Sequence, residues 1–171
     1  PVYDQVKCAI EDDMTTGSLS ERLSTLGTPM LMAHLAACSR GDIPQAHPQS
    51  SCGVCLAPKL KPAHARIVWT HSAVDIAREV RAYQPWPIAW SMLHQQRVKV
   101  LQAQPLSTAN SPLSQAQPGE ILAVSAEGMH VATGNGVLSV TKIQWPGSRP
   151  MLLRECWHQQ KLHLPLCFQD A

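Results

Sequence analysis

The sequence has few aromatic residues and little charge. Only 5% of its 171 residues are Phe, Tyr or Trp and 15% are charged, whereas 44% are hydrophobic. With this balance the chain can bury a core and need not be intrinsically disordered. No apolar run reaches the roughly 20 residues that a membrane-spanning helix needs, and no secretory leader is recognisable at the start. We therefore expect a cytoplasmic protein that does not contact a membrane.

The six cysteines do not predict a disulfide framework, because a chain of this size with abundant Leu, Val and Ala needs no covalent cross-links. Free thiols in a reducing compartment are expected instead. Cys52 and Cys55 have CxxC spacing, with His47 and His64 on either side. Zinc requires four ligands of this kind, and one CxxC in a linker is weak evidence for them. We therefore predict no metal site.

Basic residues are concentrated in the second part of the chain. Residues 1–58 hold 3 basic and 6 acidic side chains, and residues 59–171 hold 11 and 6. The two segments therefore carry net charges of −3 and +5. A basic segment is compatible with a polyanionic partner, because Lys and Arg that neutralise phosphates release condensed counterions.

The first 40 residues have the pattern of one strand and one helix. Alternating apolar residues predict a strand over 2–10, and leucines at helical spacing predict a helix from Gly17 to near Gly41, interrupted at 27–29. A single strand and helix cannot bury their apolar faces alone. Because the sequence opens at Pro1 within the strand pattern, we expect a part of a longer protein, in which this pair ends an α/β sheet.

Prolines spaced through residues 41–62 predict a linker. A second helix is expected from Ser72, with Asp75 three positions later completing a capping box and the Pro85-Trp86-Pro87 triplet ending it. The residues expected on its buried side are Ile76, Ala77, Val80 and Tyr83.

Short runs of strand character follow this helix. The pairs Pro118-Gly119 and Asn135-Gly136 predict turns, and the second is a strong hairpin signal because both residues tolerate positive φ. Short strands in this number imply a small barrel, against which a helix around Leu153 is expected to pack. The predicted strands are Ile88–Leu93, Val98–Leu101, Ile121–Val124, Met129–Ala132 and Val137–Ile143.

Several segments together resemble the methionyl-tRNA formyltransferase family. Residues 1–40, including the helix start Thr16-Gly17-Ser18-Leu19, are similar to the closing strand and helix of the family's catalytic domain. His64 and Val68 depart from the pattern, since the family has an acidic residue and an Asp or Asn there. The segments similar to the family's C-terminal domain are Ala57–Leu60, Ala65–Trp69, Arg81–Pro87, Val98–Val100, Pro118–Ile121 and Gly128–Gly136.

This resemblance implies an α+β fragment in three parts. Residues 1–40 would be the last strand and helix of a Rossmann-like formyltransferase domain, and residues 41–62 a linker. Residues 63–171 would form a small OB-like β-barrel with flanking helices, the C-terminal tRNA-binding domain of the family.

The resemblance also implies an activity for the whole enzyme, which transfers a formyl group from 10-formyltetrahydrofolate to the methionyl amino group of initiator tRNA. The family's catalytic Asn, His and Asp, and its Ser-Leu-Leu-Pro folate loop, would precede residue 1. This chain is accordingly expected to contain no catalytic residue, to bind no cofactor alone and to be monomeric. Its partners would be initiator methionyl-tRNA and the N-terminal catalytic portion.

Basic residues of the second segment are the predicted tRNA contacts. Each of them is equally consistent with a solvated surface position, and only as a group do they favour phosphate binding. The five tryptophans could stack on bases, but the scarcity of aromatics favours core packing. The predicted tRNA contacts are Lys59, Lys61, Arg66, Arg78, Arg81, Lys99, Arg149 and Arg154.

Two other functions fit the same residues. The chain could be a stand-alone OB-like RNA-binding module with a degenerate appendage at residues 1–40. Alternatively, it could be the C-terminal part of another folate-dependent enzyme, either a sugar-nucleotide formyltransferase or a formyltetrahydrofolate hydrolase. The basic linker and barrel favour tRNA as the partner.

Overall fold

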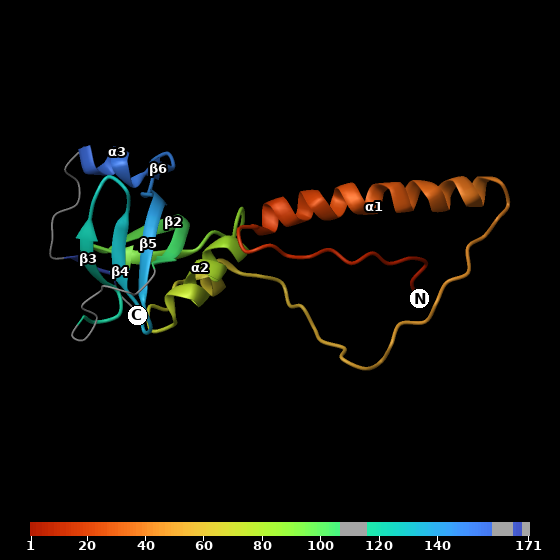
Figure 1. Cartoon of the computed structure of the whole chain (residues 1–171), viewed down its shortest axis with the longest axis horizontal. Coiled ribbons are helices and arrows are strands. Elements are labelled where there is room, and N and C mark those ends of the chain that lie inside the picture. Colours follow the sequence, from red (N-terminus) through yellow and green to blue (C-terminus); the bar gives the residue numbers. More distant parts are fainter. Residues whose placement is uncertain (107–115, 159–165, 169–171) are drawn as a thin grey trace. The chain divides into compact units, whose positions relative to one another are not determined.

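A computed structural model of the chain describes residues 1–106, 116–158 and 166–168. The chain divides into two units, Pro1–Lys59 and Leu60–Ala171 (Figure 1). No helix in the described part of the chain combines the length and the apolarity that crossing a membrane requires.

The first unit contains one long helix, α1 (Thr16–Ser39), which confirms the predicted helix. Thr15 caps it, because its hydroxyl accepts a hydrogen bond from the Ser18 N–H while the Ser18 hydroxyl accepts one from the Thr15 N–H. The expected interruption at 27–29 is wrong, since Pro29 lies inside the continuous helix. A proline removes one helical hydrogen bond but does not by itself end a helix whose other bonds remain.

The strand expected over residues 2–10 is also wrong. Only Val2 pairs, in an isolated bridge in which the Val2 N–H donates to the His47 carbonyl and the His47 N–H donates to the Val2 carbonyl. A strand needs a partner along its length, and this segment has one at a single residue. None of residues 1–59 is buried, so the first unit has no core of its own.

The second unit is a curled antiparallel sheet (Figure 1) in the order β1-β2-β5-β4-β3-β7, with β6 paired to β5. The five predicted strands are confirmed, and two short ones, β6 and β7, had no detectable pattern. A two-residue strand is too short for alternation to show. The strands are β1 (Trp90–Leu93), β2 (Gln96–Leu106), β3 (Glu120–Val124), β4 (Met129–Ala132), β5 (Val137–Gln144), β6 (Met151–Leu152) and β7 (Leu166–Cys167).

The predicted hairpin at Asn135-Gly136 joins β4 to β5, whose residues Ala132 and Val137 are direct partners. Only Gly136 adopts positive φ, at 89°, so one residue of the pair supplies the left-handed conformation. The tightness of this connection sets the register of the two central strands.

Three short helical segments accompany the sheet: η1 (Pro62–Ala65), α2 (Ala73–Ala82) and α3 (Leu153–His158). Helix α2 buries Ala73, Ile76, Ala77 and Val80 in the same core as the sheet, which confirms most of its predicted face; Tyr83 is only half-buried. Burial raises the pKa of the Tyr83 phenol, and the negative charge of the nearby Glu79 carboxylate raises it further. Helix α3, predicted around Leu153, buries that residue in the core, and the preceding Leu152 belongs to β6.

Candidate nucleic-acid interface

The outer face of the β1–β2 hairpin carries basic side chains around one tryptophan. In this antiparallel pair Trp90 lies opposite Lys99, and Met92 lies opposite Arg97. Residues directly opposite each other project to the same side of a sheet. The residues that alternate with them, Ser91, Leu93, Val98 and Val100, are all buried, so Trp90, Arg97 and Lys99 occupy the outer side.

Trp90 is in contact with two arginines. The guanidinium carbon of Arg97 lies 4.0 Å from the ring centroid, and that of Arg66 lies 5.5 Å from it. Both distances are within the range in which the electron-rich ring face attracts a cation. The indole Nε1 donates a 2.8 Å hydrogen bond to the Pro62 carbonyl, which ties the ring to η1.

Strand β5 extends this surface. Its Gln144 lies opposite Lys99 of β2, and Lys142 is two residues from Gln144, so both point to the side on which Lys99 lies. Lys99 and Lys142 are half-buried, with part of each side chain packed against neighbouring residues. We refer to Arg66, Trp90, Arg97, Lys99 and Lys142 together as the cationic face.

The structure brings only two of the eight predicted contact residues, Arg66 and Lys99, into the cationic face. Lys59 and Lys61 are exposed just before η1. Arg81 is half-buried on α2, and Arg154 is exposed on α3. The other two form ion pairs: Arg78 with Asp75 at 3.5 Å and Arg149 with Glu155 at 3.3 Å.

Two residues of the cationic face, Arg97 and Lys142, were not among the predicted contacts. Arg97 lies one residue before the predicted strand Val98–Leu101 and two residues before Lys99, so period-two alternation extended by one residue could have indicated that the two share a side. Lys142 has no such local signal. Its place beside Lys99 depends on the pairing of β2 with β5, which are about 40 residues apart in sequence.

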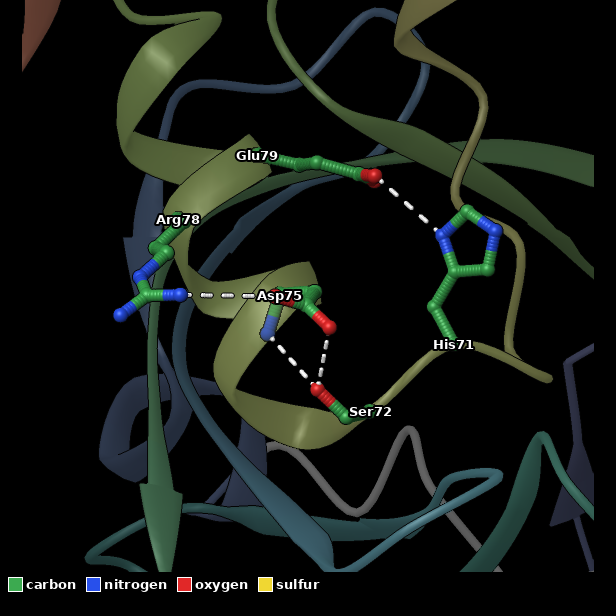
Figure 2. A network of polar contacts seen from close by, with 5 residues as sticks. All are labelled: His71, Ser72, Asp75, Arg78 and Glu79. Atoms are coloured by element: carbon green, nitrogen blue, oxygen red, sulfur yellow. Dashed lines mark hydrogen bonds and ion pairs between the residues drawn. The ribbon is translucent and has the colours of Figure 1, made fainter.

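The start of helix α2 contains a separate polar network (Figure 2). The Ser72 hydroxyl accepts a 3.1 Å hydrogen bond from the Asp75 N–H and donates a 2.6 Å bond to the Asp75 carboxylate. The predicted capping box is therefore wrong in one respect, because the Asp75 side chain bonds the capping hydroxyl rather than the Ser72 backbone. His71 contacts Glu79 at 3.3 Å in the same network.

We expect Ser72→Ala to lower the free energy of unfolding by about 1 kcal/mol, because the substitution leaves the Asp75 N–H without its capping acceptor. Denaturant unfolding followed by circular dichroism measures the change. Ser72→Thr keeps the hydroxyl and should stay close to the unsubstituted protein. Equal losses in the two variants would show that the hydroxyl is not the stabilising group.

The tryptophans do not share one environment. Core packing, predicted for most of them, is correct for Trp69, which is fully buried and stacks on Phe168 at a centroid distance of 4.9 Å. Trp145 packs against the core from a half-buried position. Trp86 is an exception, because it is 53% exposed. The Trp157 side chain lies outside the described residues.

Cys52 and Cys55 are both exposed in the first unit. Within the ranges that the structure describes, no three His, Cys, Asp or Glu side chains converge as a metal ion would require. The chemistry that the described side chains support most directly is attraction of an anion by the cationic face, because Arg and Lys supply N–H donors with full positive charge.

Comparison with known proteins identifies the family. Residues 59–161 match the model of the formyl transferase C-terminal domain. The chain belongs to this formyl transferase family. The matched region covers most of the second unit, including every strand of the cationic face.

The formyl transferase similarity extends through the first unit as well. The chain is 35% identical over 161 residues to the methionyl-tRNA formyltransferase of Pseudomonas putida strain KT2440, covering 94% of this chain and 50% of that protein. It is 38% identical over 149 residues to the methionyl-tRNA formyltransferase of Xanthomonas oryzae pv. oryzae strain PXO99A, covering 87% and 47%. The chain therefore spans about half the length of these curated relatives.

Solved structures share the fold. A variant of HypX from Aquifex aeolicus superposes with a TM-score of 0.66 over 87% of this chain and 26% of its own, at 20% identity. HypX in complex with tetrahydrofolic acid gives a TM-score of 0.52 over 73% and 21%, at 23% identity. At this level of identity the likeness concerns the fold alone.

Proposed function

We propose that this chain is the C-terminal part of a cytoplasmic methionyl-tRNA formyltransferase, which transfers formyl from 10-formyltetrahydrofolate to the methionyl amino group of initiator tRNA. The observation that carries the proposal is the 35% identity to a curated methionyl-tRNA formyltransferase across 94% of the chain. In the proposed enzyme the N-terminal portion performs the chemistry and binds the folate. This chain supplies the surface that faces the tRNA.

Residues 1–40 would then be the closing segment of the Rossmann-like catalytic domain, followed by a linker at 41–62 and the OB-like domain at 63–171. The exposure of apolar side chains in the first unit supports this assignment. Helix α1 exposes large apolar side chains, among them Leu23, Leu31, Met32 and Leu35, and no residue of the unit is buried. A helix with apolar side chains spread around it in this way is stable in water when other elements cover it.

The tRNA would be held through its phosphates by the cationic face together with the exposed linker lysines. The second segment carries the positive charge of the chain, +5 over residues 59–171. Lys59 and Lys61 lie just before η1, whose Pro62 carbonyl bonds Trp90. The lysines therefore precede the cationic face directly along the chain.

We expect the double substitution Lys59→Glu/Lys61→Glu to weaken the binding of initiator tRNA by about tenfold or more at low salt, because it replaces two phosphate-attracting charges with repelling ones. Fluorescence anisotropy of labelled tRNA, repeated at several salt concentrations, measures the affinity and its dependence on salt. The unsubstituted chain should lose affinity steeply as salt rises.

The matched control is Lys7→Glu/Arg40→Glu, which changes the net charge by the same amount at exposed positions of residues 1–58, the segment of charge −3. It should bind tRNA nearly as well as the unsubstituted chain. Binding that is insensitive to salt, or equal affinities of the two double variants, would count against the proposed function.

A further inference from the structure

We propose that Arg66 and Arg97, held over the ring of Trp90, form a preorganised binding site for one phosphodiester group of an RNA backbone. This inference deepens the proposed function and rests on it. It adds Arg97 as a contact residue and assigns Trp90 the role of a positioning residue, which orders the two guanidinium groups without touching the phosphate itself.

Trp90 is held through both its ring and its backbone. The indole Nε1 donates a 2.8 Å hydrogen bond to the Pro62 carbonyl, and the Trp90 backbone carbonyl accepts a 2.8 Å bond from the Ile67 N–H. The second bond belongs to a parallel bridge that pairs Trp90 with Arg66. The backbone bearing Arg66 is therefore held beside β1, and the backbone bearing Arg97 is held by strand pairing within the hairpin.

Two guanidinium groups against one ring repel each other. In the described residues no carboxylate forms an ion pair with Arg66 or Arg97, whereas Arg78 and Arg149 each have an acidic partner. The attraction of the ring offsets part of this repulsion. A bound anion would offset the rest, because it would accept hydrogen bonds from both forks at once.

The neighbouring charges favour a phosphate over a base as the ligand. Lys99 lies directly opposite Trp90, and Lys142 is on the next strand, so the anion would sit in a field of four positive charges. Arg97 is 4.0 Å from the Trp90 ring centroid, where it occupies space that a stacked base would need. Arginine forks match the oxygen geometry of a phosphate in two-point contacts.

The first test compares two double variants that remove the same charge. Arg66→Gln/Arg97→Gln should weaken tRNA binding by roughly tenfold and reduce the slope of log affinity against log salt by about 1.5, since two phosphate-facing cations are lost. Arg22→Gln/Arg40→Gln removes two exposed arginines of residues 1–58, outside the predicted contacts, that are paired with carboxylates. It should change affinity by less than about twofold.

The second test leaves charge unchanged. Trp90→Leu removes the ring that orders both guanidinium groups and should weaken binding by about fivefold, whereas Trp90→Phe keeps a π face and should retain most of the affinity. Thermal unfolding of each variant identifies loss of fold as a separate effect. If the basic side chains act only as unordered charges, Trp90→Leu should bind tRNA as strongly as the unsubstituted chain does.

The outcomes separate this inference from the proposed function. Salt-dependent tRNA binding by the unsubstituted chain, with equal affinities of the two arginine double variants, would overturn the arginine site and leave the proposed function in place. Folded Trp90→Leu and Trp90→Phe proteins that both bind at full strength would overturn the positioning role. An unsubstituted chain with no salt-dependent binding would contradict the proposed function itself.

Discussion

Replacing Gly134 with alanine is expected to lower the free energy of unfolding of the second unit by about 3 kcal/mol or more. An added Cβ would lie 1.8 Å from the Thr70 carbonyl oxygen, a backbone atom that no rotamer change can move aside. The Gly134 N–H also donates to the carbonyls of Trp69 and His71, so the two backbones approach closely. Chemical denaturation followed by circular dichroism measures the loss.

The matched control for this prediction is Gly27→Ala. Nothing lies within 4 Å of the position that its Cβ would take, and Gly27 is inside helix α1. Alanine has a higher helix propensity than glycine by about 1 kcal/mol, so helix content should stay constant or rise. A Gly134→Ala protein that unfolds at the same denaturant concentration as the unsubstituted chain would show that the backbones can separate at little cost.

Trp69→Ala is expected to have an effect of similar size, a loss of about 4 kcal/mol. Trp69 is fully buried and stacks on Phe168, with ring planes 22° apart. Its Nε1 donates a 3.0 Å hydrogen bond to the hydroxyl of Ser91, which is itself buried. Alanine leaves a cavity the size of an indole and a buried hydroxyl without its donor.

Trp86→Ala provides the comparison, because it removes the same side chain from a position that is 53% exposed. Its cost should be about 1 kcal/mol or less, since little apolar surface returns to water. Thermal melts of both variants measure the two losses of stability. Curves for tRNA binding show whether either substitution also affects the interface. Similar losses in the two variants would contradict the burial that the structure assigns to Trp69.

Local patterns were sufficient for most elements of the second unit. The strands around Val98, Ile121, Met129 and Val137 followed from alternation, and Gly136 marked the hairpin between the last two. The same rules failed at residues 2–10, where alternation occurs without a partner strand. Strand formation depends on pairing, which an isolated pattern cannot guarantee.

The residues of the site were harder to predict from local sequence patterns. A list of basic residues cannot distinguish Arg78, which faces Asp75, from Arg97, which lies over Trp90. Arg78 has Asp75 three positions before it in the same helix, whereas Arg97 contacts a residue of the neighbouring strand. Their difference arises from which neighbours the fold brings within a few ångströms, and Coulomb and cation–π energies depend on that distance.

The sequence by itself determined the family, the excess of positive charge after residue 59 and the order of most strands, because identity, composition and short-range periodicity are local properties. Tertiary structure alone decided that Arg66, Trp90, Arg97 and Lys142 share one face. The physical reason is that strand register sets both side-chain direction and distance between remote residues, and register follows from burial of the opposite face of the sheet.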